Sequence, residues 1–219
     1  MPMATLHKIR LDNVEKELEY FWNSIGCNAV YAIQRSLDKV NRMFKANIEI
    51  AGYSYANSFL QPTNVSNGLD DRLADELSLY TGRKFRHGSN RTEVDMVCDE
   101  NPRLNFEFKA SAVEDYNNDG RLKYHPIPFG MTNGGGDTEK KNKNTKYNKK
   151  NVSQYHYCVY LRYHMPESET DNFEVLEIYI GIYKPNDLKN STKNSKSAYL
   201  SKEKFKEQFR RIYWKPGIL

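Results

Sequence analysis

Cysteine is scarce in this chain: Cys27, Cys98 and Cys158 are the only three in 219 residues, and they lie far apart. An odd, scattered set argues against a disulfide framework and against a cysteine zinc site. Cys98 and Cys158 stand in apolar surroundings, which predicts buried free thiols. Long apolar runs are also missing, since no stretch approaches the roughly 20 apolar residues that span a bilayer. The first ten residues lack the apolar segment of a secretory signal, so we expect an intracellular chain with no membrane segment.

Positive charge is only in slight excess overall, but it is concentrated in part of the sequence. The net charge is +5 and the isoelectric point is about 8.9, values that permit an acidic partner without demanding one. Residues 138–151 carry six lysines against one glutamate, and residues 184–215 form a second basic region. A lysine-rich segment is either a solvated surface loop or a contact to nucleic-acid phosphates.

Helical periodicity is clear in several places. Two helices are expected within residues 11–47, with Gly26 as the stop between them. A third is expected over residues 68–82, closed by its final glycine, and a last one over residues 201–214, begun by a serine N-cap. Residues 53–62 are aromatic and polar and predict a loop or a short strand.

Strict alternation predicts strands over residues 153–164 and 176–183. With the helices, these indicate one α/β domain over residues 1–219. Residues 113–152 are the least regular part, and a loop of that length in a compact domain is either functional or disordered. Its glycine run, residues 134–136, is no P-loop, because no Gly-Lys-Ser or Gly-Lys-Thr follows.

Two further strands carry the residues that say most about function. Residues 93–98 form the first, and Asn101-Pro102 marks the turn before the second, residues 104–109. Alternation puts the leucine and two phenylalanines of the second strand on one face, and Asn105, Glu107 and Lys109 on the other. Asp95 of the first strand would share that polar side. Converging carboxylates suit a hard divalent cation, above all Mg²⁺, and a lysine beside them can hold a water molecule.

Asp95, eleven intervening residues and then Glu107-Phe108-Lys109 resemble the signature of the PD-(D/E)XK nuclease superfamily. Val94 departs from the pattern, because the motif has proline there. The resemblance covers roughly residues 69–185 in element order, with the catalytic core in 69–111 and 153–185. It implies a restriction-endonuclease-like core, a small mixed β-sheet flanked by helices. The nearest likeness is to type II restriction endonucleases of the prokaryotic cytoplasm.

The resemblance also implies roles for individual residues. Asp95, Glu107 and the backbone carbonyl of Phe108 would bind Mg²⁺, while Lys109 would position or deprotonate the attacking water. A helical carboxylate before the first catalytic strand often joins the metal in such nucleases, and Glu76 fits that place; an ordinary surface acid is the alternative. The products would be 5′-phosphate and 3′-hydroxyl ends, and the working form a homodimer on a short palindrome of double-stranded DNA.

Basic and polar residues around this core are candidates for DNA contact. Residues 113–152 are interpreted as a DNA-recognition loop. Glu93 could join the metal, or pair with a neighbouring arginine. The candidate DNA-binding residues are Arg86, Arg91, Ser111, Lys140, Lys141, Lys143, Lys146 and Gln154.

Three alternatives remain open from the sequence. A repair endonuclease or junction resolvase would use the same three residues on a different DNA shape. A non-catalytic nucleic-acid-binding module would bind in a salt-dependent way without hydrolysis. A structural or interaction protein would use its lysines only for solubility.

Overall fold

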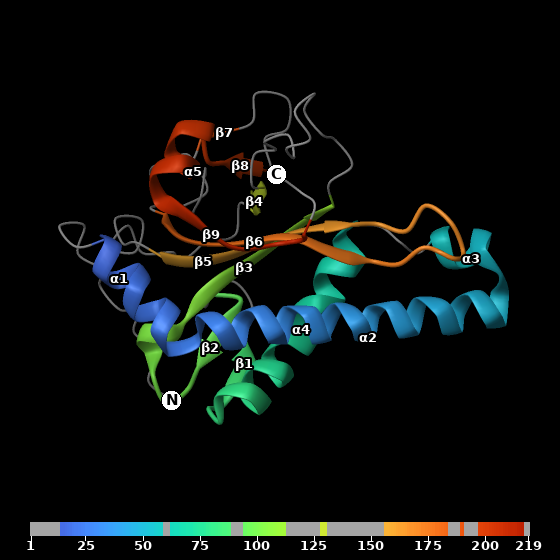
Figure 1. The fold of residues 1–219 in the computed structure, drawn as a ribbon, viewed down its shortest axis with the longest axis horizontal. Coiled ribbons are helices and arrows are strands. Elements are labelled where there is room, and N and C mark those ends of the chain that lie inside the picture. Colours follow the sequence, from blue (N-terminus) through green and yellow to red (C-terminus); the bar gives the residue numbers. More distant parts are fainter. Residues whose placement is uncertain are drawn as a thin grey trace, which may run out of the picture.

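The computed structural model describes residues 14–58, 62–88, 94–112, 128–130, 156–183, 189–190 and 197–216. Over these residues the chain forms an α/β fold, in which a mixed six-stranded sheet is flanked by helices (Figure 1). This confirms the α/β class expected from the periodicity. None of the helices in the described ranges combines the length and apolarity needed to cross a membrane.

The six strands of the main sheet lie in the order β1-β2-β3-β5-β6-β9. Their bounds are β1 Phe85–His87, β2 Met96–Cys98, β3 Phe106–Ala112, β5 His156–His164, β6 Glu174–Tyr183 and β9 Phe209–Trp214. β3 and β5 are parallel, and all other neighbouring strands are antiparallel. The expected strands over β2, β3, β5 and β6 are confirmed within the described ranges. β1 lies in the basic segment 83–91, which was expected to be either a turn that contacts the DNA backbone or a connector.

A second sheet of three short strands has the order β4-β8-β7. Its strands are β4 Pro128–Gly130, β7 Lys189–Asn190 and β8 Ser197–Tyr199. β4 is the only part of residues 113–152 that the structure describes, so the expected recognition loop otherwise lies outside the described residues.

The expected helix stop at Gly26 is wrong. α1 (Val14–Phe21) continues through a π-helical turn, Trp22–Gly26, into the long helix α2, Cys27–Ala51. Gly26 has ordinary right-handed helical angles, and a Cβ added there would overlap the Trp22 ring. The glycine therefore allows a close approach of the indole, and the chain remains helical.

The segment after α2 is also helical. α2 ends at Gly52, whose φ of 81° lies in the left-handed region that favours glycine. α3, Tyr53–Ser58, replaces the expected loop or short strand. α4 spans Pro62–Thr81 and so begins earlier than the predicted residue 68. Gly82 closes it as predicted, with a φ of 65°.

The last predicted helix is only half correct. Ser201 caps α5, Lys202–Gln208, by accepting a hydrogen bond from the Lys204 amide, as expected. The chain then becomes β9, whose backbone pairs with the edge of β6. Aromatic and β-branched residues suit an edge strand, and the backbone pairing that β6 offers outweighs the helical spacing.

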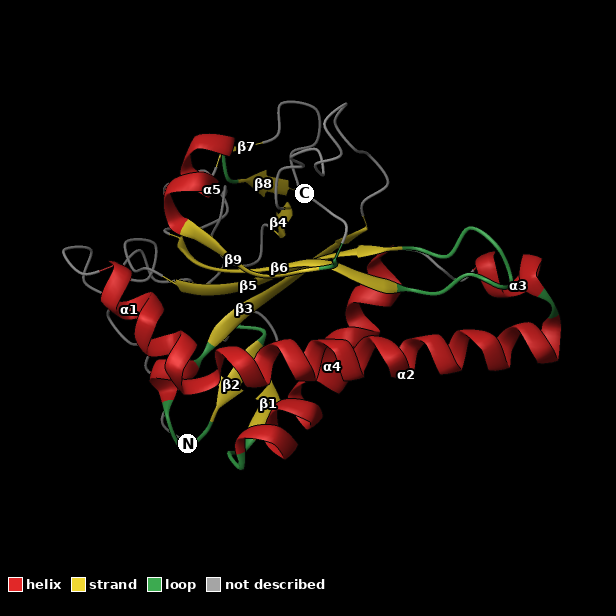
Figure 2. Cartoon of the chain, in the orientation of Figure 1, coloured by secondary structure: helices red, strands yellow, loops and turns green. Residues whose placement is uncertain are grey.

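The two faces of the main sheet are covered differently (Figure 2). Helices α1, α2 and α4 lie on one face and enclose the main apolar core, where the Phe21 ring stacks on Tyr157 at 4.5 Å and meets Phe106 edge-on at 5.6 Å. α5 lies on the opposite face, where Phe205 packs against Tyr160 and Tyr179. This second face also carries the charged residues of β3.

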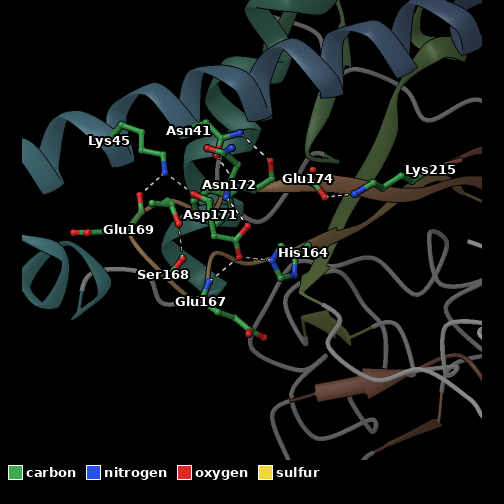
Figure 3. A network of polar contacts seen from close by, with 12 residues as sticks. Asn41, Lys45, His164, Glu167, Ser168, Glu169, Asp171, Asn172, Glu174 and Lys215 are labelled. Atoms are coloured by element: carbon green, nitrogen blue, oxygen red, sulfur yellow. Dashed lines mark hydrogen bonds and ion pairs between the residues drawn. The ribbon is translucent and has the colours of Figure 1, made fainter. Parts of the chain in front are cut away.

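The turn between β5 and β6 is fastened to α2 by polar contacts (Figure 3). The Asn41 side chain donates to the Phe173 carbonyl at 2.8 Å and accepts from its amide at 2.7 Å. Lys45 donates to the backbone carbonyls of Glu169 and Asp171, each at 2.6 Å. These contacts hold the turn of the β5–β6 hairpin against α2.

Candidate functional site

The sheet brings Asp95, Glu107 and Lys109 together. Asp95 stands immediately before β2, and the antiparallel pairing of Met96 with Phe106 places it across from Glu107 on β3. Phe106 and Phe108 face the main core, so Glu107 and Lys109 face the opposite side, as the alternation predicted.

The Lys109 ammonium lies between the two carboxylates. Its Nζ donates to Asp95 Oδ2 at 2.6 Å and to Glu107 Oε2 at 2.9 Å. The backbone amide of Phe108 also donates to Asp95 Oδ2, at 3.0 Å. The Glu107 side chain is only 2% exposed, against 15% for Lys109 and 21% for Asp95. Asp95 is therefore the most exposed of the three side chains, and Glu107 is the most deeply buried.

Burial and mutual charge set the protonation of the three groups. Burial raises the pKa of Glu107 above its usual range, and Lys109 offsets this only in part. Burial also acts to raise the pKa of Asp95, but the Lys109 ammonium and the hydrogen bonds from Glu107, Lys109 and the Phe108 amide hold it below its ordinary value. The pKa of Lys109 is raised, because both carboxylates outweigh the effect of burial. These shifts favour the ammonium form of Lys109 and the carboxylate form of Asp95, and they oppose the ionisation of Glu107.

A fourth acid, Asp70 on α4, belongs to the same electrostatic environment. Burial, followed by repulsion from Asp95, raises its pKa to about 8, and Lys109 lowers it in part. Its Oδ1 is buried and has no hydrogen-bond partner in the part of the chain that the structure describes. Its Oδ2 lies 3.9 Å from Nε2 of His87 on β1. Asp70 is thus the carboxylate of α4 that turns toward the β2–β3 site.

Sequence reasoning chose Glu76 from this helix and missed Asp70. Glu76 is buried and forms an ion pair with Lys39 of α2, so its contact is to a neighbouring helix. Asp70 stands four residues before Ala74 and seven before Leu77, both buried, and this spacing could have indicated its inward direction.

The remaining candidate residues lie in four different settings. Phe108 takes part through its amide, and the metal-binding role of its carbonyl remains a prediction. Ser111 lies two residues beyond Lys109 on the same face of β3. Arg86 on β1 donates through Nε to Asp99 Oδ1 at 2.9 Å. Candidates outside the described residues are Arg91, Glu93, Lys140, Lys141, Lys143, Lys146 and Gln154.

Two of the three cysteines take their expected place. Cys98 and Cys158 are buried free thiols, as predicted, and Cys27 is exposed. Cys158 is the register neighbour of Glu107 on β5, and burial raises the pKa of its thiol well above the ordinary value. A thiol held in its neutral form at this place adds no charge to the acids beside it.

The oxygen donors fit a hard divalent cation in type, but Lys109 stands between them. Among the described residues, no group of three or more His, Cys, Asp and Glu side chains is arranged to hold a metal ion. The Asp95 and Glu107 carboxylates converge on the Lys109 ammonium, a cation, and the unpaired Oδ1 of Asp70 is a further buried acceptor. Together they form an acidic cluster, defined as Asp70, Asp95, Glu107 and Lys109, with three carboxyl groups around one ammonium.

No protein-family model, curated protein or solved structure matches this chain.

Proposed function

We propose that the chain is a Mg²⁺-dependent endonuclease for double-stranded DNA, with a restriction-endonuclease-like core. The observation that carries the proposal is the position of Lys109, whose ammonium contacts two carboxylates from adjacent strands. The pattern of Asp95 with Glu107-Phe108-Lys109 supplies the expected residue types, and the β2–β3 pairing supplies their convergence. A type II restriction enzyme acting as a homodimer is the favoured form.

The residues of the acidic cluster have different roles in the proposed hydrolysis of the phosphodiester. Because its pKa is raised, Lys109 retains its proton and positions the attacking water by donating to it. The same ammonium offsets charge that develops on the phosphate. A water oxygen forms the new bond to phosphorus, the bond to the 3′ oxygen breaks, and the protons of water and leaving oxygen exchange with solvent. The products carry 5′-phosphate and 3′-hydroxyl ends.

Asp95 and Glu107 would hold Mg²⁺, together with the Phe108 carbonyl and with Asp70 in place of Glu76. When bound, the ion supplies positive charge at the scissile phosphate and lowers the pKa of its water. For this, Glu107 and Asp70 must be ionised, although burial raises the pKa of both. Lys109 must also move from between the acids toward the substrate.

A repair endonuclease or junction resolvase with the same residues is the second candidate. It is favoured by an exposed aromatic residue on the sheet face of the acidic cluster, Trp214, which is 50% exposed. An aromatic ring of this kind suits an unpaired base better than an intact duplex.

The test is cleavage of plasmid and phage DNA by the purified chain, in Mg²⁺ or in EDTA. Wild type should give discrete fragments only in Mg²⁺, and Lys109→Ala should give none. Lys84→Ala is the matched control, since Lys84 is 72% exposed and pairs with Asp99, away from the acidic cluster. A smear with the same dependence would replace the restriction enzyme by a non-specific or structure-selective nuclease. Cleavage that survives in Lys109→Ala would overturn the assignment.

A further inference from the structure

A second charged cluster lies on the same sheet face as the acidic cluster. Arg162 on β5 donates through Nη1 to Glu177 Oε2 at 2.8 Å, and Arg211 on β9 donates through Nη1 to Glu177 Oε1 at 3.0 Å. Arg162 and Glu177 are buried, while the Arg211 side chain is 36% exposed. Two guanidinium groups therefore share one carboxylate.

Arg211 is held in place on two sides. Its guanidinium carbon lies 5.0 Å from the centre of the Trp214 ring, a cation–π contact. The salt bridge to Glu177 fixes its other side. Trp214 is half exposed although tryptophan is usually highly buried, so the indole offers a free apolar face beside a fixed guanidinium. The arginine cluster is defined here as Arg162, Glu177, Arg211 and Trp214.

The strand register links the two clusters. Ser111, two residues beyond Lys109, pairs with Arg162, which pairs with Glu177, which in turn pairs with Trp214. Three strand spacings of about 4.8 Å place Trp214 roughly 14 Å from Ser111. α5 covers the neighbouring row through Phe205, which packs on Tyr160 and Tyr179. The row from Ser111 to Trp214 thus leads from the acidic cluster to an exposed, positively charged end.

We infer that Trp214 and Arg211 form a binding site for one unpaired nucleotide of the nucleic-acid substrate. The base stacks on the exposed indole, and the adjacent phosphate accepts hydrogen bonds from the Arg211 guanidinium. Trp214 supplies a flat apolar surface, while the partly exposed Arg211 guanidinium attracts the anion. The inference rests on the proposed function, which identifies the ligand as a nucleic acid. It adds that a strand near the cut is unpaired when it is bound.

Fluorescence of the two tryptophans, Trp22 and Trp214, gives a direct test. A Trp22→Phe background leaves Trp214 as the reporter, and a short oligothymidylate is titrated in EDTA so that it is not cleaved. We expect saturable quenching. Trp214→Ala, followed by anisotropy of a labelled oligothymidylate, should weaken binding about fivefold to a hundredfold, whereas Trp214→Phe retains most of it.

Arg211 has a matched control beside it on the same strand. Arg210 points to the helix-covered face and pairs with Glu15, so Arg210→Gln removes the same charge from the other side of β9. Arg211→Gln should weaken binding and reduce the slope of log affinity against log salt by about 0.7. Arg210→Gln should leave the slope unchanged. Circular dichroism of each variant checks that it is folded.

The outcomes separate this site from the proposed function. If Trp214→Ala binds as tightly as wild type, or if Arg210→Gln and Arg211→Gln lose affinity equally, the nucleotide site is overturned, while Mg²⁺-dependent cleavage by wild type would still stand. If the wild-type chain binds the oligothymidylate without quenching Trp214, the site is likewise overturned. If it binds neither single-stranded nor duplex DNA, both proposals fail together.

Discussion

The acidic cluster and the arginine cluster lie on one face of the same sheet and have opposite ratios of acidic to basic side chains. In the first, the carboxyl groups of Asp95 and Glu107 contact a single ammonium. In the second, two guanidinium groups contact the single carboxylate of Glu177. The first contains more acidic than basic side chains and suits a cation, whereas the second contains more basic than acidic side chains and suits an anion.

This difference between the clusters indicates how buried charged side chains can be arranged for DNA, a polyanionic substrate. Burying ions is unfavourable unless partners and hydrogen bonds compensate, so a chain selected only for stability would be expected to balance each cluster. The two clusters, which have opposite ratios of acidic to basic side chains, lie on the same sheet face about three strand spacings apart. One provides a place for a cation and the other a place for a phosphate. The helix-covered face, by contrast, buries mainly apolar side chains.

The largest expected effect is on cleavage by the acidic cluster. Asp95→Asn keeps the shape of the side chain but removes the charge that Lys109 and the Phe108 amide stabilise. We expect the cleavage rate in Mg²⁺ to fall by about a thousandfold or more. Glu76→Gln, which alters an acid paired with Lys39, should retain activity within about threefold. Equal losses in the two variants would remove the distinction between catalytic and helix-pairing acids.

The largest expected effect on stability is in the arginine cluster. Glu177→Ala would leave Arg162 and Arg211 without the carboxylate that they share, and the free energy of unfolding should fall by about 3–5 kcal/mol. Glu174→Ala is the control, because its ion pair with Lys215 is exposed and should contribute less than about 1 kcal/mol. Urea unfolding measures both. A small effect of Glu177→Ala would show that Glu177 does not compensate buried charge.

A smaller loss is expected from the packing beside the arginine cluster. A Cβ at Gly181 would overlap the Phe209 ring, which begins β9, so Gly181→Ala should destabilise the fold by about 1–3 kcal/mol. Gly68 lies within α4, and an added Cβ there meets no atom within 4 Å. Gly68→Ala should therefore stabilise by about 0.5–1 kcal/mol. Thermal unfolding of both variants would show opposite signs, and a loss in both would contradict this packing.

The last prediction concerns how the free energy of unfolding depends on pH through the ionisation of Asp70. Its pKa of about 8 in the folded chain lies above the ordinary value of 3.8, so the folded chain holds a proton that the unfolded chain releases between these pH values. Its contribution to stability is fully present below about pH 4 and is lost as the pH rises to about 8. Asp70→Asn cannot titrate and should be more stable than wild type at pH 9, by roughly 1.4 kcal/mol for each pKa unit of the shift, but almost equally stable at pH 4. A pH-independent difference in denaturant midpoint would place Asp70 in a more solvated site.

Much of the acidic cluster could be predicted because its signals are local. The alternation around Glu107 and Lys109 fixes their common face, and the Asn101-Pro102 turn returns the chain beside Asp95, where Asn101 accepts a hydrogen bond from the Arg103 amide. Asp70 could not be assigned in the same way. Its raised pKa arises from burial and from charges more than twenty residues away, which only the folded chain brings near.

The arginine cluster was missed for a related reason. The spacing of Phe205, Phe209 and Ile212 is helical, so residues 201–214 were predicted as one helix. Backbone pairing with β6 turns the second half into β9, and only then do Arg211 and Trp214 reach Glu177. The edge of a sheet offers hydrogen bonds that no local pattern records, so tertiary pairing overrode periodicity here.

The central claim is that the acidic cluster binds a divalent cation and that the arginine cluster does not. Its most direct test is calorimetric titration of the wild-type chain with Mg²⁺ at pH 6.5 and pH 8.5. We expect saturable Mg²⁺ binding that is tighter at pH 8.5. The protein should release protons as it binds the ion, because Asp70 and Glu107 must ionise to bind it. Asp95→Asn should lose this binding, and Arg211→Gln should keep it. No saturable binding at either pH, or binding that Asp95→Asn leaves intact, would contradict the central claim.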